Sequence, residues 1–224
     1  MERQGNPGEG QVLAMIILLT VTAFLSGSLM FSYWLGRVAS KDIRREGDGN
    51  PGAFNLWQAA GYRLGMLGVV LDFAKGYIPL LLMLQSGLIQ GYEPVYVAPA
   101  FILGHVFSPF MKFKGGKAIA VTFGVWSALT RFEGALAYAL ILALMKLCFR
   151  WLPSHRTDPR NADGFQVVAG FLILPIYIGL IHFSMPLLYI WVINFGILLY
   201  TNRKAWISFL KSNSYNRTTR NQGH

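Results

Sequence analysis

The chain is organised around Lys112-Phe113-Lys114-Gly115-Gly116-Lys117, which lies between two hydrophobic segments. It gathers three ammonium groups around a pair of glycines, and glycines let a backbone approach a ligand closely. The apolar run from Ala118 onward is expected to begin a helix, whose N-terminal N–H groups and dipole favour an anion at the same place. The hexamer therefore predicts a phosphate-binding loop. The alternative is an ordinary basic turn between two membrane spans, where lysines are common.

Composition indicates a membrane protein. Of the 224 residues, 54% are hydrophobic and only 13% are charged, and the mean hydropathy is +0.41. A soluble domain of this size is less apolar. The single cysteine, Cys148, excludes a disulfide framework and a cysteine-based metal site. The net charge of +10 could suggest a nucleic acid, but the basic residues follow a topological pattern instead, so no nucleic acid is expected as a partner.

Seven apolar segments have, or approach, the length of a membrane span, since a bilayer core of roughly 30 Å needs about 20 helical residues. They are Gln11–Leu35, Tyr62–Gln85, Val95–Met111, Ala118–Leu129, Gly134–Trp151, Phe165–His182 and Met185–Tyr200. The fourth segment is short for a span. We therefore predict an all-α, polytopic membrane protein with about seven transmembrane helices.

The lysines and arginines predict the orientation of these helices. Seventeen of them fall on one side of the seven-span arrangement and two on the other, with Lys75 inside a span. Cytoplasmic loops are enriched in lysine and arginine, so the N-terminus is expected outside and the C-terminus in the cytoplasm. Residues 1–10 would form an extracytoplasmic tail, residues 11–201 the membrane domain and residues 202–224 a basic cytoplasmic tail.

The first basic loop contains Gly47-Asp48-Gly49-Asn50-Pro51-Gly52-Ala53-Phe54-Asn55, which formally matches the G-x-G-x-x-G dinucleotide fingerprint. We reject a dinucleotide site because that fingerprint requires a preceding strand in a βαβ unit. The glycines and the two asparagines instead predict a tight loop with exposed backbone and amide donors, suited to a polyol or a phosphate. The alternative is a simple Gly/Asn turn.

Asp72, Lys75 and His105 are ionisable residues inside predicted spans. Asp72 and Lys75 share one helix face, where their charges neutralise each other. Such residues are usually functional, although a buried pair that fixes helix packing explains them nearly as well. His105, just before the lysine cluster, is either a proton acceptor or a hydrogen-bonded packing residue. No zinc, P-loop or nucleophile-elbow pattern is present, so neither a metal nor another cofactor is expected.

Taken together and in this order, the stretches resemble the acyl-phosphate:glycerol-3-phosphate acyltransferases of the PlsY type, which are bacterial enzymes with seven spans. The matching pieces include Gly47-x-Gly49-Asn50-x-Gly52-Ala53-x-Asn55, Leu71-Asp72-x-x-Lys75-Gly76, the block from Gly104-His105 to Lys117, and Arg203. The resemblance covers most of the chain and is densest from Gly27 to Gly124.

The resemblance implies transfer of a fatty acyl group from acyl phosphate to the 1-hydroxyl of glycerol 3-phosphate, giving lysophosphatidic acid and inorganic phosphate. An acyl phosphate is already activated, so such a site mainly needs cations for two phosphates and donors for the developing oxyanion. The resemblance also implies a monomeric, multi-pass enzyme of the bacterial plasma membrane, in contact with membrane lipids, with its active face in the cytoplasm.

The residues that carry the resemblance give the expected site. His105 and Lys117 are the expected catalytic residues. The expected ligands of substrate and phosphate are Gly49, Asn50, Gly52, Asn55, Asp72, Lys75, Lys114, Gly115, Gly116, Lys117 and Arg203.

Several positions depart from the family's pattern, among them Asp48, Phe54, Gln58 and Asn202. Asp48 stands where the family has a serine and should repel phosphate. Phe54, Gln58 and Asn202 replace a threonine, an arginine and a histidine. These replacements motivate a second hypothesis, a non-catalytic membrane protein that binds a phosphorylated lipid or another anion on the same scaffold. A third hypothesis is a channel or transporter, and only the pair of ionisable residues in the second span supports it.

Overall fold

The computed structural model describes residues 7–151, 159–181 and 184–211. The secondary structure of these residues consists of helices joined by loops and contains no strand. The α-helices are α1 (Pro7–Ser28), α2 (Phe31–Val38), α3 (Ala53–Ala60), α4 (Tyr62–Gln85), α5 (Pro94–Val106), α6 (Ile119–Leu129), α7 (Glu133–Trp151), α8 (Pro159–Ile181) and α9 (Met185–Thr201). Two short 3-10 helices are η1 (Ile43–Arg45) and η2 (Pro109–Met111), and the helical segment Arg203–Lys211 follows α9. The all-α prediction is confirmed.

The predicted apolar segments coincide with α1 and with α4 to α9. Four helices of the described chain are long and apolar enough to cross a membrane, and the pair Met185–Thr201 and Arg203–Lys211, bent by 68°, makes a fifth if it counts as one span. The helix α6 has only 11 residues, as the short fourth segment suggested. The chain is a polytopic membrane protein, while seven spans and the orientation of the termini stay predictions.

The first predicted span, Gln11–Leu35, is not one continuous helix, because α1 ends at Ser28 and α2 begins at Phe31. Ending a helix inside an apolar region frees backbone carbonyl groups that need donors. The hydroxyl of Ser108 donates to the carbonyl oxygen of Ser28 at 2.7 Å, and the ammonium of Lys75 donates to that of Leu29. Polar side chains from elsewhere in the bundle therefore stabilise this break.

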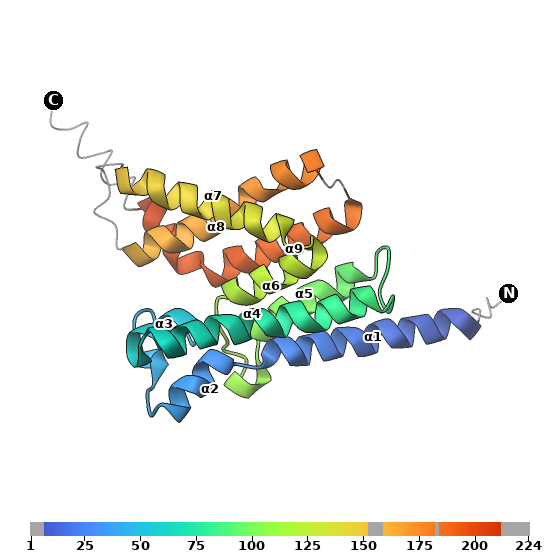
Figure 1. The fold of residues 1–224 in the computed structure, drawn as a ribbon, viewed down its shortest axis with the longest axis horizontal. Coiled ribbons are helices and arrows are strands. Elements are labelled where there is room, and N and C mark those ends of the chain that lie inside the picture. Colours follow the sequence, from blue (N-terminus) through green and yellow to red (C-terminus); the bar gives the residue numbers. More distant parts are fainter. Residues whose placement is uncertain (1–6, 152–158, 182–183, 212–224) are drawn as a thin grey trace.

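The helices lie side by side in two groups (Figure 1). The helix α1 packs on α5, α3 and α6 pack on α4, and α7 packs on α8, while α9 joins the groups through α5, α6 and α8. Glycines permit the closest contacts. A Cβ on Gly104 would collide with the carbonyl oxygen of Phe24, and one on Gly124 with that of Phe73. Small residues at such crossings are typical of membrane helices.

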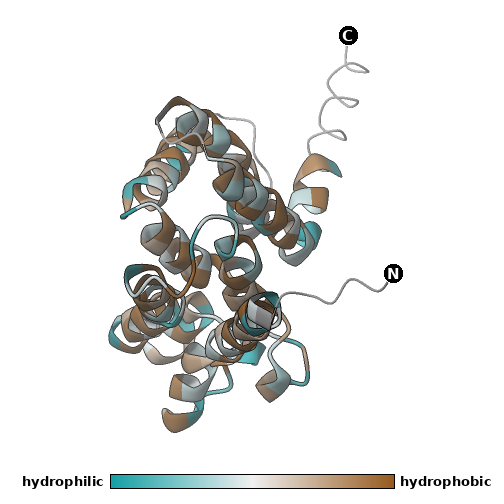
Figure 2. Cartoon of the chain, turned by 90° about the vertical axis from the view of Figure 1, so that its right-hand side faces the viewer, coloured by the Kyte–Doolittle hydropathy of each residue, from teal (hydrophilic) through white to brown (hydrophobic). Residues whose placement is uncertain are grey.

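Aromatic side chains fill the middle of the bundle, where Phe101, Trp126 and Phe171 are buried. Large apolar side chains such as Leu18, Leu144 and Ile176 are also exposed on the outside. In Figure 2, hydrophobic residues accordingly lie on the outward as well as the inward sides of the helices. An apolar exterior of this kind fits a lipid environment.

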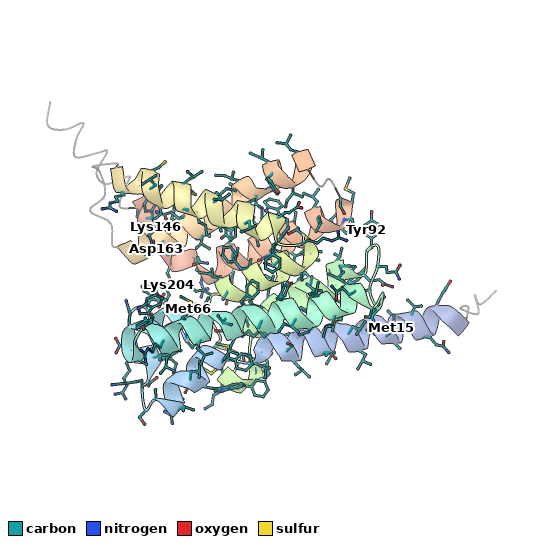
Figure 3. The ribbon with its side chains drawn as sticks, viewed as in Figure 1. Met15, Met66, Tyr92, Lys146, Asp163 and Lys204 are labelled. Carbon is teal, nitrogen blue, oxygen red and sulfur yellow. The ribbon has the colours of Figure 1, made fainter. Side chains whose placement is uncertain are left out.

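Three polar segments meet at one end of the bundle. They are the loop of residues 39–52 before α3, the loop of residues 112–118 before α6, and the C-terminal end of α9 with the residues that follow it. Figure 3 places Lys204, Asp163 and Lys146 at this end, and Tyr92, in a connecting turn, at the opposite end. The two stretches that the sequence singled out thus lie on the same side of the molecule.

Candidate active site

A cavity of about 510 Å³ opens between the three polar segments. Among the described residues that line it, five are cationic, and Asp48 is the one carboxylate. The cations are Arg44, Lys114, Lys117, Arg203 and Lys204. The wall is therefore strongly positive and suited to an anion with more than one charge.

The first loop is shaped around the side chain of Asn55, which is 2% exposed. Its amide donates to the carbonyl oxygens of Glu46 and Asn50, both at 2.9 Å, and to Oδ1 of Asp48 at 3.1 Å. Gly47 has a φ of +58°, which favours glycine, and a Cβ there would lie 2.6 Å from Oδ1 of Asn55. Asn55 thus holds the loop in one shape.

The loop of residues 112–118 is called the lysine loop below, and its two glycines allow it to pack against the end of α5. The N–H of Gly115 donates to the carbonyl oxygen of Val106 at 2.9 Å, and the N–H of Gly116 donates to that of His105 at 3.1 Å. A Cβ on Gly115 would collide with that same oxygen of His105. These two N–H groups are therefore used within the protein, while both glycines line the cavity and their contact with phosphate stays a prediction.

The lysine loop also contains non-glycine residues in the left-handed region. Lys112, Phe113 and Ala118 have φ values of 54°, 59° and 62°, a conformation that is uncommon for such residues. Ala118 is the residue before the first turn of α6, and no side chain caps that turn. The first N–H groups of α6 start beside Lys117, which adds the positive end of a helix dipole to the cationic wall.

The carboxylate of Asp48 pairs with the ammonium of Lys117, with Oδ2 and Nζ 2.6 Å apart. Its Oδ1 accepts hydrogen bonds from the N–H of Asn50 and the amide of Asn55, both at 3.1 Å. Burial raises the pKa of Asp48, but the hydrogen bond and charge of Lys117, with the two N–H donors, hold this pKa below its ordinary value of 3.8. The carboxylate is charged at neutral pH.

Behind the lysine loop lies a second set of charged groups, which is buried. The ammonium of Lys75 is 2.9 Å from Oδ1 of Asp72 and 2.8 Å from Nδ1 of His105. The hydroxyl of Ser32 donates to Oδ2 of Asp72 at 2.5 Å. A Cβ on Gly116 would collide with Nε2 of His105, so the imidazole lies directly under the loop. The expected pairing of Asp72 with Lys75 is confirmed.

The expected site residues divide into three groups. Those that line the main cavity are Gly49, Asn50, Lys114, Gly115, Gly116, Lys117 and Arg203. Asn55 lines a second, smaller cavity. Four line neither cavity: Gly52, before the first turn of α3, and the buried Asp72, Lys75 and His105. Which of these residues contact a substrate stays a prediction.

The second cavity, of about 220 Å³, shares a wall with the first. The shared residues are Asp48, Asn50, Lys117 and Asn202. Its other walls come from α3, α6 and α8 and include the apolar side chains of Phe54, Ile119 and Val167. The two cavities therefore offer a polar and a partly apolar compartment on either side of Lys117.

Sequence reasoning missed several residues of the cavity wall. Arg44 and Lys204 line the main cavity, although neither is among the expected site residues. Asn202 is 1% exposed, lines both cavities, and its Oδ1 has no hydrogen-bond partner among the described residues. The hydroxyl of Thr201 donates to the carbonyl oxygen of Lys117 at 3.3 Å. For Thr201, Asn202 and Lys204, the available signal was their position next to Arg203, and Asn202 also stood out as a departure from the family's pattern.

Comparisons with known proteins agree with this geometry. The family model of glycerol-3-phosphate acyltransferase matches residues 17–212. Glycerol-3-phosphate acyltransferase 1 of Thermotoga maritima is 39% identical over 198 residues, which cover 87% of this chain and 97% of the relative. The glycerol-3-phosphate acyltransferase of Aquifex aeolicus is 31% identical over 166 residues, or 74% of this chain and 86% of the relative.

A solved structure has the same fold. It is the crystal structure of PlsY, an integral membrane glycerol 3-phosphate acyltransferase, in its glycerol 3-phosphate form. The two structures agree with a TM-score of 0.74 at 26% sequence identity, over 88% of this chain and 92% of PlsY. Because the family model spans most of the chain and the relatives align along most of their length, this membrane protein belongs to the glycerol-3-phosphate acyltransferase family.

Proposed function

We propose that this acyltransferase moves a fatty acyl group from acyl phosphate to the 1-hydroxyl of glycerol 3-phosphate, forming lysophosphatidic acid for phospholipid synthesis. The relatives carry the name of glycerol-3-phosphate acyltransferases, and the proposal adds the donor and the roles of individual residues. The observation that carries the proposal is the main cavity, where the loop of residues 39–52, called the asparagine loop, meets the lysine loop around five cations.

The main cavity has the charge that two phosphorylated substrates require. Arg203 stacks over the ring of Tyr200 at 4.3 Å and donates to its carbonyl oxygen at 2.8 Å, which fixes the guanidinium at the cavity wall. Lys114 and Lys204 are exposed there and have room to reach a phosphate. Guanidinium and ammonium groups are the usual partners of phosphate oxygens.

The second cavity gives the acyl group a place. Phe54, Ile119 and Val167 provide apolar contacts next to the polar compartment, and burial of each methylene of an acyl chain contributes about 0.8 kcal/mol. Lys117 lies on the shared wall, so an acyl carbonyl placed between the compartments would lie beside its ammonium.

The reaction then proceeds by direct transfer. The 1-hydroxyl oxygen of glycerol 3-phosphate forms a bond to the acyl carbon, and the bond from that carbon to the phosphate oxygen breaks. The phosphate leaves with the bonding electrons, and the hydroxyl proton passes to a phosphate oxygen. Lys117 stabilises the oxyanion and the leaving phosphate. His105, buried behind the loop, acts by holding the backbone that carries Lys117 in place.

The setting of the enzyme follows from the distribution of its basic residues and its apolar exterior. The cavity would face the cytoplasm of a bacterial plasma membrane, because the loops that form it lie on the side of the predicted spans that carries seventeen of the twenty lysines and arginines. Membrane lipids would surround the exposed apolar side chains, and one chain supplies the whole cavity, which is consistent with a monomer.

The non-catalytic alternative is not favoured. The relative that is 39% identical along 97% of its length is named as an acyltransferase. Of the four replaced positions, Asp48 is neutralised by Lys117, Phe54 lines the second cavity, and Gln58 lies outside both cavities.

The proposal is tested with the purified protein in detergent, given acyl phosphate and glycerol 3-phosphate. We expect lysophosphatidic acid, detected by mass spectrometry, and inorganic phosphate, each formed only when both substrates are present. Lys117→Ala should abolish both products, whereas Lys41→Ala, which removes an exposed lysine outside the cavities, should not. A wild-type protein that forms no more product than Lys117→Ala contradicts the proposal.

A further inference from the structure

We propose that Asp48 is a built-in competitor of the substrate phosphate. Its carboxylate occupies the anion position formed by Lys117, Asn50 and Asn55 while the site is empty, and it thereby sets the affinity of that position for phosphate. This inference rests on the proposed function, and it assigns a role to the acidic residue that the sequence alone predicts to be unfavourable.

The geometry that carries the inference is the convergence of three donors on one carboxylate. Oδ2 of Asp48 is 2.6 Å from the ammonium of Lys117. Oδ1 accepts from the N–H of Asn50 and from the amide of Asn55, both at 3.1 Å. These three residues are among those expected on independent grounds to hold substrate or phosphate. A carboxylate and a phosphate use the same kinds of donor, so Asp48 takes the place of a ligand oxyanion.

The pair of Asp48 and Lys117 is open to exchange. The side chains are 32% and 25% exposed and line both cavities, so an incoming substrate reaches them without unfolding the protein. Ion pairs with this much exposure contribute little to stability. A phosphate that also contacts other cations of the wall is therefore able to displace the carboxylate from Lys117.

Competition between Asp48 and phosphate predicts the direction in which the affinity for phosphate changes. Asp48 and a bound phosphate would repel each other and share one ammonium, so the negative charge of Asp48 weakens phosphate binding. After the reaction, the return of Asp48 to Lys117 favours release of the inorganic phosphate product. Removing the charge should strengthen the binding of both glycerol 3-phosphate and inorganic phosphate.

The test is Asp48→Asn, which keeps the shape of the side chain and removes its charge. Glu46→Gln is the matched control, because it makes the same change of charge on an exposed side chain of the same loop that lines neither cavity. In detergent we expect the Kd of glycerol 3-phosphate and of inorganic phosphate, measured by calorimetry, to fall roughly threefold to tenfold in Asp48→Asn. The control should stay within about twofold of wild type.

Unchanged or weaker binding in Asp48→Asn overturns the inference. Asp48→Ser is a second variant with the same expected direction, for use if the asparagine variant does not fold. Because calorimetry requires no turnover, the two proposals fail separately. Tighter phosphate binding in a protein that transfers no acyl group would leave this inference standing and end the proposed function, whereas an active enzyme whose variant binds no tighter would do the reverse.

Discussion

Two aspartate–lysine pairs in this protein have the same chemistry and different surroundings. Asp72 and Lys75, on α4, are 3% and 1% exposed and are 2.9 Å apart. Asp48 and Lys117, on two loops, are 32% and 25% exposed and are 2.6 Å apart. The buried pair has no room to change partners, and the open pair faces a cavity. Burial therefore separates a pair that supports the site from one that takes part in binding.

The difference predicts where each pair will show its effect. Removing one member of a buried pair leaves an uncompensated charge in a medium of low dielectric constant, which is strongly destabilising. Removing one member of an open pair leaves a charge that water solvates. Variants of the first pair should thus act on the stability of the fold, and variants of the second on substrate binding and turnover.

The largest effect is expected from Lys75→Met, which leaves Asp72 buried without its cation. We expect a loss of about 3 to 5 kcal/mol in the free energy of unfolding, measured by chemical denaturation in detergent. The double variant Asp72→Leu with Lys75→Met should recover part of that loss. Lys146→Met, at a lysine side chain that is 72% exposed, is the control and should change stability by about 0.5 kcal/mol at most. A single variant as stable as wild type would remove the distinction between the pairs.

The next effect is expected from Lys117→Met, which removes the cation on the wall between the two cavities. We expect kcat to fall by about 100-fold to 1,000-fold, because one electrostatic contact to the reacting oxygens is lost. Thermal unfolding should be close to wild type, since the pair is open. A variant that loses stability and keeps its kcat would show that the two pairs are alike.

A smaller effect is expected where the lysine loop meets the end of α5. Gly115→Ala places a Cβ against the carbonyl oxygen of His105, and the backbone cannot yield easily, so we expect about 1 to 3 kcal/mol of destabilisation and a displaced loop. Gly196→Ala is the matched control, because a Cβ at Gly196 would meet no atom within 4 Å. The measurement is kcat alongside thermal unfolding, and equal behaviour of the two variants would contradict the packing role of Gly115.

The smallest effect is a dependence of stability on pH. Lys117 and the N–H donors lower the pKa of Asp48 below 3.8 in the folded protein, in spite of its burial. The stability that this shift contributes is present above pH 3.8 and is lost as the pH falls through the lowered folded-state value. The difference in Tm between wild type and Asp48→Asn should stay constant between about pH 6 and 8 and shrink below pH 3.8. A difference that grows as the pH falls would contradict this assignment.

The sequence predicts the buried pair and not the open one, for a physical reason. Spacing of three residues on a helix brings Asp72 and Lys75 together wherever the helix lies. Asp48 and Lys117 meet only because two loops fold toward each other, and Asp48 therefore looked unfavourable beside a phosphate site. The same limit explains why the partners of Gly115 and Gly116 and the place of Asn202 in the wall of both cavities were found only in the structure.

The length of the apolar segments was enough to predict most of the helices. The apolar segments predicted α1 and the helices α4 to α9, including the short α6. The break after Ser28 was missed, because it depends on donors from Ser108 and Lys75 that come from other parts of the chain. Periodicity and hydropathy do not report such partners.

Above all, we propose that the asparagine loop and the lysine loop form a single phosphate position, in which the carboxylate of Asp48 competes with the substrate. A structure of the protein with glycerol 3-phosphate tests it most directly. We predict the phosphate within hydrogen-bond distance of Nζ of Lys117, and the carboxylate of Asp48 moved away from the 2.6 Å contact seen here. Glycerol 3-phosphate bound outside this cavity, with the contact between Asp48 and Lys117 intact, would contradict the claim.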